Sequence, residues 1–159
     1  MKPRPATVHL PSPHLPDADW ADRFELALNG KGLTAIEAAE RSLGNSPSWV
    51  SALLALRNRL VSLVGLKTEA PAPGEHGLIG PFPVLSRNDD EVVLGFNDAH
   101  LDFRIVVDIR AGSAVNQIVG MTTLIRRHNT LGRVYLAAVM PFHKVIVPTM
   151  LAGAAGPHA

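Results

Sequence analysis

Residues 115–154, VNQIVGMTTLIRRHN followed by TLGRVYLAAVMPFHKVIVPTMLAGA, contain the two elements on which the predicted architecture depends. The first part is rich in β-branched residues and predicts a strand. The second part predicts a long helix, which Asn129 or Thr130 can cap and which ends near Gly153. Such a helix requires a sheet on which it can pack. The helical face expected to contact the sheet consists of Leu131, Val134, Tyr135, Ala138, Phe142, Val145 and Ile146.

Composition indicates one domain with a large apolar interior and limits the classes of function. The 159 residues are 47% hydrophobic and 18% charged, and the net charge of +1 gives no electrostatic reason to expect nucleic-acid binding. The chain has no cysteine, and its histidines are not paired at metal-ligand spacing, so we expect no metal and no cofactor. No apolar signal segment precedes the domain, and we expect a cytoplasmic protein.

Residues 134–155 are apolar and long enough to cross a bilayer. His143 and Lys144 lie near the middle of this stretch, and Pro141 and Pro148 interrupt it. A lysine at the centre of an inserted helix costs about 2.5–3.5 kcal/mol. We therefore expect this helix to pack on a sheet, without stable membrane insertion.

The rest of the chain predicts strands and helices in an α+β order. Five prolines predict a flexible arm over residues 1–19, followed by a single domain at 20–153 and a disordered tail at 154–159. Residues 100–110 alternate, with apolar side chains toward the core and charged ones toward water. The predicted elements are a strand at 23–28, two short helices at 35–43 and 47–64, strands at 79–87, 91–96, 100–110 and 115–129, and the last helix.

Four blocks of sequence carry a resemblance to known proteins: LPDADWADRF at 15–24, PSWVSALLALRNRLVSLVGL at 47–66, HLDFRIVV at 100–107 and HNTLGRVYLAAVMPFHKVIVPTML at 128–151. These blocks resemble an uncharacterised bacterial family, domain of unknown function 2867. The element order resembles the START-like, birch-pollen-allergen-like (SRPBCC) superfamily. This resemblance implies a helix-grip fold, in which a curved antiparallel sheet of five to six strands wraps on the C-terminal helix. It also implies a cavity between them for a small hydrophobic or amphipathic ligand.

Candidate ligand-binding residues lie on the last helix and on elements expected to face it. Tyr135 and His143 are about two turns apart and could present a general acid and a general base to one ligand. Alternatively, Tyr135 packs on the sheet and His143 bonds a backbone group freed by Pro141. The remaining candidates are Phe142, Phe103, Ile105, Thr123 and Asn58.

Three classes of function fit this sequence. The leading hypothesis is binding of a small hydrophobic or amphipathic molecule between sheet and helix. The second is a cyclase- or hydrolase-like enzyme that uses His143 or Tyr135. The third is a protein-interaction module that uses a sheet edge near Pro81 and Pro83. The sequence contains no recognisable catalytic triad, no HExxH motif and no phosphate-binding glycine loop, and it does not indicate an oligomeric state.

Overall fold

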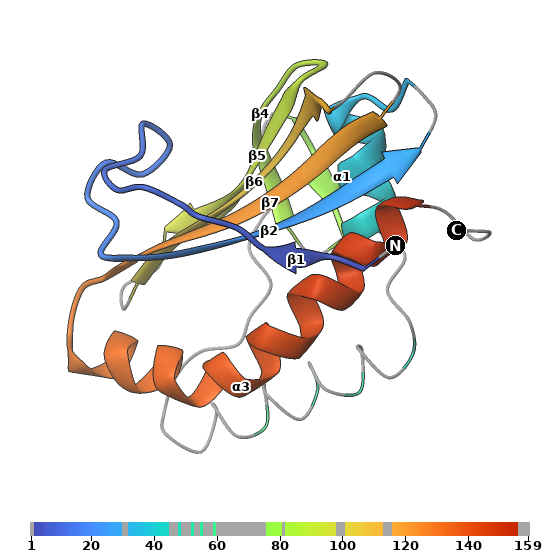
Figure 1. Ribbon diagram of the computed structural model, residues 1–159. Helices are drawn as coiled ribbons and strands as arrows, with labels where there is room; N and C mark the ends of the chain where they lie inside the picture. Colours follow the sequence, from blue (N-terminus) through green and yellow to red (C-terminus); the bar gives the residue numbers. More distant parts are fainter. Residues whose placement is uncertain are drawn as a thin grey trace.

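In the part of the chain that the structure describes, the fold consists of a seven-stranded antiparallel sheet packed with helices α1 and α3 (Figure 1). The computed structural model describes residues 2–29, 32–44, 48, 52, 55, 59, 76–80, 82–97, 101–112 and 116–155. The strands are β1 (Arg4–Pro5), β2 (Trp20–Asn29), β3 (Leu78–Ile79), β4 (Phe82–Arg87), β5 (Glu91–Asn97), β6 (Leu101–Ala111) and β7 (Asn116–Arg127). The helices are α1 (Ala35–Leu43) and α3 (Thr130–Ala152), and the 3-10 turn η1 (Gly153–Ala155) follows α3.

The strand order in the sheet is β1-β2-β7-β6-β5-β4-β3. Strands β3 to β7 form a meander, and β2 closes the sheet against β7. The predicted α+β class and C-terminal helix are confirmed, but the predicted count of five to six strands is wrong. The stretch 79–87 divides into β3 and β4 because Gly80 turns the chain with a φ of +57°. The two-residue strand β1 is too short to produce an alternating pattern.

The sheet edge predicted near Pro81 and Pro83 is partly covered. Pro83 of β4 pairs with Leu78 of β3, whereas Pro81 lies outside the described residues. Leu78 is itself 46% exposed on the outermost strand. The edge of the sheet is therefore β3 and not β4.

The first of the two predicted short helices is α1. The Thr34 hydroxyl accepts a hydrogen bond from the Glu37 backbone N–H (3.3 Å), and the Glu37 carboxylate accepts one from the Thr34 N–H (2.8 Å). This reciprocal capping box starts the helix. Most of the second predicted helix, 47–64, lies outside the described residues. The members of it that are described are helical and exposed, and they are Ser48, Ala52, Ala55 and Arg59.

The main core lies between the inner face of the sheet and the two helices. Odd-numbered β6 residues such as Ile105 and Val107 point into it, as the alternation predicted, and they meet Met121 of β7. Helix α1 contributes small residues and Leu43. Helix α3 contributes Ile146, Val147, Met150 and Leu151. Burial of these side chains supplies the main driving force that holds α3 on the sheet.

The sequence predicted that the outer face of the sheet would be exposed to water, but part of this face is covered. Leu15 packs there against Val93, Val106 and Leu124, and Val106 is only 5% exposed. Three ion pairs hold the same segment on the sheet: His14–Glu91 (3.1 Å), Asp17–Arg126 (3.3 Å) and Asp19–Arg127 (3.1 Å). Part of the stretch predicted as an arm therefore covers the outer face.

Helix α3 begins and ends where predicted but packs through a different face. The Asn129 side chain accepts a hydrogen bond from the Gly132 N–H (3.0 Å), and Gly153 ends the helix. The predicted inward face is wrong for Leu131, Val134, Ala138 and Val145, which are exposed, and right for Ile146. The buried hydrophobic side chains of α3 are those of Leu136, Ile146, Val147, Met150 and Leu151. The helix carries apolar residues on several of its sides, so the periodicity of the sequence alone does not identify the side that faces the sheet.

Arg23, on the outer side of β2, joins three strands. Its guanidinium donates to both carboxylate oxygens of Asp108 (2.7 and 2.9 Å), to the Thr122 hydroxyl (2.8 Å) and to Glu25 (3.0 Å). A side chain at Gly120 would overlap this guanidinium. Arg110 donates to both carboxylate oxygens of Glu25 (2.9 Å each). The network fixes β2 against β7 and β6, and β2 carries part of the candidate site on its opposite face.

Glu25 gives this network a dependence on pH. Burial acts most strongly on its carboxyl and raises the pKa, but hydrogen bonds from Arg110 and Arg23 outweigh it, so the pKa lies below the ordinary value of 4.5. A lowered pKa contributes stability above pH 4.5 that is lost as pH falls through the folded value. We expect Glu25→Gln to lower the free energy of unfolding by about 1 kcal/mol at neutral pH, which corresponds to a fall in Tm of about 2–4 °C.

This difference in Tm should shrink as pH falls from about 7 towards about 3, because progressive protonation of the wild-type carboxyl removes the charge that the two arginines stabilise. Thermal unfolding followed by circular dichroism across that range measures it. Glu40→Gln, at an exposed position on α1, is the matched control and should show little difference at any pH. A difference for Glu25→Gln that is undiminished at low pH would contradict the assignment.

Candidate functional site

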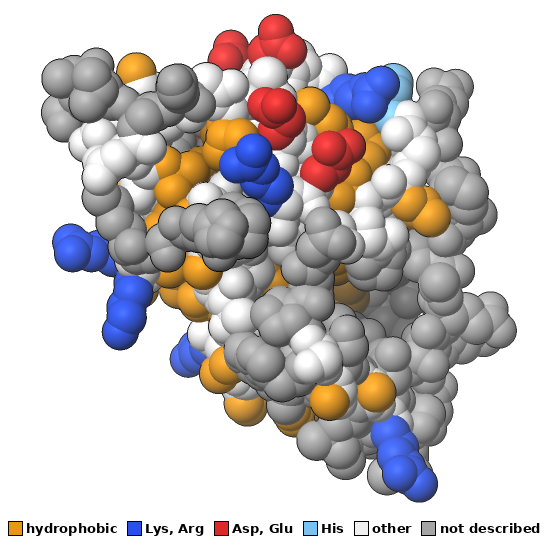
Figure 2. Space-filling model, turned by 90° about the vertical axis from the view of Figure 1, so that its right-hand side faces the viewer, with side chains coloured by type: hydrophobic (Ala, Val, Ile, Leu, Met, Phe, Trp, Pro, Cys, Tyr) orange, Lys and Arg blue, Asp and Glu red, His pale blue; other side chains and the backbone are white. Residues whose placement is uncertain are grey.

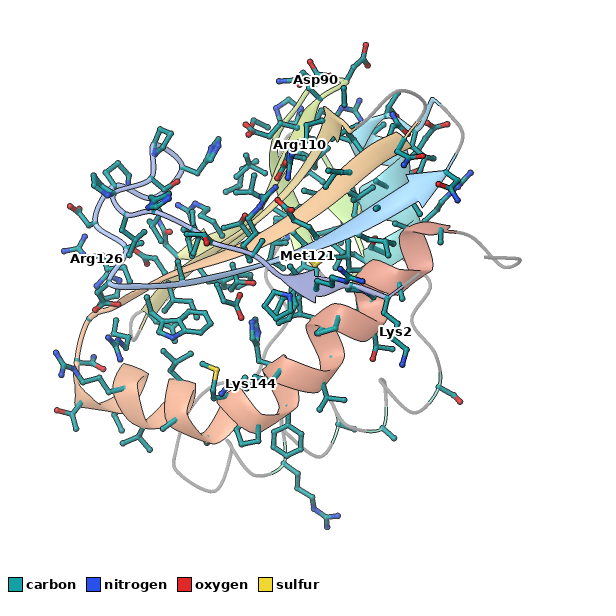
Figure 3. The ribbon with its side chains drawn as sticks, in the orientation of Figure 1. Lys2, Asp90, Arg110, Met121, Arg126 and Lys144 are labelled. Atoms are coloured by element: carbon teal, nitrogen blue, oxygen red, sulfur yellow. The ribbon has the colours of Figure 1, made fainter. Side chains whose placement is uncertain are left out.

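A polar pair lies inside the apolar interface between the sheet and α3. Trp20, Asp22 and Phe24 occupy every second position of β2 and so share its inner face. Thr123 of β7 is the register partner of Asp22. His143 of α3 reaches this point of the sheet from the helix. Figure 3 shows the side chains that fill the region between the sheet, where Met121 is labelled, and α3, where Lys144 is labelled.

The pair consists of one imidazole and one carboxylate in direct contact. His143 Nε2 lies 2.9 Å from Asp22 Oδ2, and the two side chains are 14% and 23% exposed. Trp20 meets the His143 ring edge-on, with centroids 5.5 Å apart and an angle of 79° between the planes. The second carboxylate oxygen, Asp22 Oδ1, is buried and has no hydrogen-bond partner among the described residues.

The contact determines what each group can do chemically. When the imidazole is neutral and donates from Nε2 to Asp22, its Nδ1 carries a free lone pair that can accept a proton. A carboxylate that holds a histidine in this way fixes the orientation of the ring. Asp22 Oδ1 can accept a hydrogen bond from a hydroxyl or an amine. The pair therefore offers a base and an acceptor at one position.

Apolar clusters lie on both sides of the pair along the interface. On one side, Trp20 and Met140 pack against a cluster of Leu101, Ile125 and Leu136. On the other side, Phe24 and Phe142 pack against the main core. The candidate site is thus one polar point within an apolar layer, an arrangement typical of sites that orient a mainly apolar ligand.

The structure brings several of the candidate residues close to this pair. His143 belongs to it, and Thr123 and Ile105 lie in the same cross-strand row as Asp22. Phe103 is one row away and packs edge-on against Phe82, at 5.9 Å and 80°. The half-buried Phe142 contacts the main core. The Tyr135 side chain and Asn58 lie outside what the structure describes.

Sequence reasoning missed Asp22 and Trp20. The predicted first strand began at residue 23, whereas β2 begins at Trp20. Extending the alternation of Phe24, Leu26 and Leu28 backward by two steps places Asp22 and Trp20 on the inner face. A carboxylate at an inward-facing strand position is unusual, and it is the signal that would have identified the site.

A second histidine–carboxylate pair lies at the junction of β7 and α3, outside the interface between the sheet and α3. His128 Nε2 is 2.9 Å from Asp102 Oδ1, where β7 leads into α3, and His128 is 27% exposed. Asp102 is an even-numbered β6 residue and points away from the main core. Within the described ranges, no group of three or more His, Asp or Glu side chains could hold a metal ion.

Comparison with known proteins gives one match. The family model described as "Protein of unknown function (DUF2867)" matches residues 14–150. This range includes Asp22 and His143 and the residues that flank them, Trp20, Phe24, Met140 and Phe142. No match was found among curated proteins or among solved structures.

Proposed function

We propose that this chain, which belongs to the DUF2867 family of proteins of unknown function, binds a small amphipathic molecule between the sheet and α3. The observation that carries this proposal is Asp22 Oδ1, a buried carboxylate oxygen that lacks a donor in the described part of the chain. Leaving such an atom unsatisfied costs about 1–3 kcal/mol. A ligand that donates a hydrogen bond there would remove this cost.

The order of elements supports a helix-grip fold of the START-like kind. Strand β2 lies beside β7, α1 follows β2, and α3 follows β7 directly and packs on the inner face. In such a fold the ligand would occupy the space between sheet and last helix. The cluster around Leu136 and the cluster around Met121 would contact its apolar parts.

The polar pair selects the chemistry of the ligand. A carboxylate repels a carboxylate or a phosphate, and it accepts hydrogen bonds from a hydroxyl or an amine. His143 adds a nitrogen that can accept or donate. We therefore expect a neutral or cationic donor group, such as an alcohol, a phenol or an amine, on an apolar body.

A matched series of probes tests this expectation. Naphthol, naphthylmethylamine, naphthoic acid and unsubstituted naphthalene share one apolar body and differ in the polar group. Naphthol and the amine should raise Tm and bind in calorimetry more tightly than the acid. Asp22→Ala should weaken naphthol binding by about 10- to 100-fold, since hydrogen bonds to charged groups contribute about 1.5–3 kcal/mol.

Asp102→Ala is the matched control, because it removes a carboxylate paired with a histidine outside the candidate site. It should leave naphthol binding unchanged. Binding of the acid as tight as that of the alcohol, or unchanged naphthol binding in Asp22→Ala, would reject the proposal. Absence of binding by all four probes would also count against it.

The 2.9 Å contact between His143 and Asp22 favours one second candidate, a hydrolase- or cyclase-like enzyme. In that case His143 acts as the general base and Asp22 orients it. Turnover of aryl esters that is lost in His143→Asn, with naphthol binding retained, would support catalysis. Equal turnover in both proteins would exclude this role for His143.

A further inference from the structure

The exposed side of α3 carries a continuous row of apolar side chains, here called the α3 stripe: Leu131, Val134, Ala138, Pro141 and Val145. The spacing of three and four residues places them along one side of the helix. The larger members are substantially exposed: Leu131 42%, Val134 44% and Val145 49%. The opposite side of α3, with Ile146, Met150 and Leu151, is buried in the core. As far as the described residues go, the stripe is therefore available to a partner outside the fold.

The charged residues of α3 itself, Arg133 and Lys144, have one sign. Arg133 and Lys144 are both exposed and, in the part of the chain that the structure describes, form no ion pair. They are 11 residues apart, about three turns, and so lie on the same flank of the helix. Residues 130–155 contain no Asp or Glu. In the view of Figure 2, the coloured acidic side chains lie in the upper part.

We propose that the α3 stripe docks on the surface of an anionic lipid membrane. The apolar side chains would enter the boundary between head groups and acyl chains, and Arg133 and Lys144 would contact lipid phosphates. This proposal does not depend on the proposed ligand site, which lies on the buried side of α3.

Charge favours a membrane over a second copy of the chain. Two α3 stripes packed together would bring two copies of Arg133 and Lys144 near each other without an acidic partner on either helix. By length and composition alone, Thr130–Ala155 could cross a membrane. Its packing against the sheet instead favours an orientation in the plane of the interface.

Flotation with vesicles of phosphatidylcholine, with and without phosphatidylserine, tests the electrostatic part. The wild type should bind the anionic vesicles and be released by high salt. Replacing both cations, Arg133→Gln with Lys144→Gln, should lower partitioning about thirtyfold. The matched control replaces two exposed cations outside α3, Lys2→Gln with Arg87→Gln, and should lower it much less.

A second pair of variants tests the apolar part. Val134→Asp with Val145→Asp should abolish vesicle binding, whereas Leu85→Asp, at an exposed apolar position on β4, should not. Circular dichroism establishes that each variant is folded. Absence of binding to anionic vesicles, or unchanged binding by the valine variants, would overturn the proposal. A dimer in size-exclusion chromatography that the valine variants dissociate would assign the surface to a second copy and also overturn it.

Discussion

Gly95→Ala is expected to lower the free energy of unfolding by about 2–6 kcal/mol, the sum of backbone strain and overpacking. Gly95 of β5 has a φ of +142°, a backbone conformation that residues other than glycine rarely adopt. A Cβ atom there would also overlap the Phe103 carbonyl oxygen of β6 and lie 3.0 Å from the Arg104 Cα. Both neighbours are backbone atoms, so rotation of a side chain cannot relieve the contact. Urea denaturation with the same slope for both proteins measures the change.

Gly77→Ala provides the matched control. Gly77 also has a positive φ, +78° against +142° for Gly95, but a Cβ added there would have no atom within 4 Å. Its substitution should therefore cost only the backbone strain, about 1 kcal/mol. Equal losses for the two variants would mean that the close approach of β5 to β6 is not rigid. The rigidity of this contact matters for the candidate site because β5 and β6 pair through Gly95–Arg104 and Phe96–Phe103, and Phe103 is one of the candidate residues.

The elements that could be predicted from sequence are those with a local physical signal. The capping box of Thr34 and Glu37 marked α1. The alternation in residues 101–109 gave both the strand β6 and its inward side. Asn129 and Gly153 marked the ends of α3. Each of these signals depends on residues close together in sequence. These elements can therefore be predicted without knowledge of the tertiary contacts.

The features that could not be predicted depend on contacts between distant segments. The inward side of α3 is set by its packing on β2 and β7, because the helix is apolar on several sides. The two-residue strands β1 and β3 exist only because a neighbouring strand pairs with them. The Asp22–His143 pair joins residues 121 positions apart. No local pattern contains that information.

Asp22 and His143 should behave in stability measurements as a pair retained for function. His143→Leu alone is expected to lower the free energy of unfolding by about 1–3 kcal/mol, since it leaves the half-buried Asp22 carboxylate without its one hydrogen-bond partner in the described structure. The double variant Asp22→Leu with His143→Leu should instead equal the wild type or exceed it by about 1–3 kcal/mol, because apolar side chains fit this interface without a desolvation cost. Chemical denaturation of the four proteins of this cycle gives the coupling energy.

The pair of Asp102 and His128 is the matched comparison, with the same 2.9 Å contact, a more exposed histidine (27% against 14%) and a more buried carboxylate (12% against 23%). Replacing both of its members by leucine should leave naphthol binding unchanged, because this pair lies outside the candidate site. A stabilised Asp22/His143 double variant that no longer binds naphthol would mean that the polar pair costs stability and serves the ligand, as expected of a functional site. A double variant less stable than either single variant would instead make the pair a structural element. In that case the unpartnered Asp22 oxygen would no longer argue for a ligand, whereas membrane docking by the α3 stripe would be unaffected.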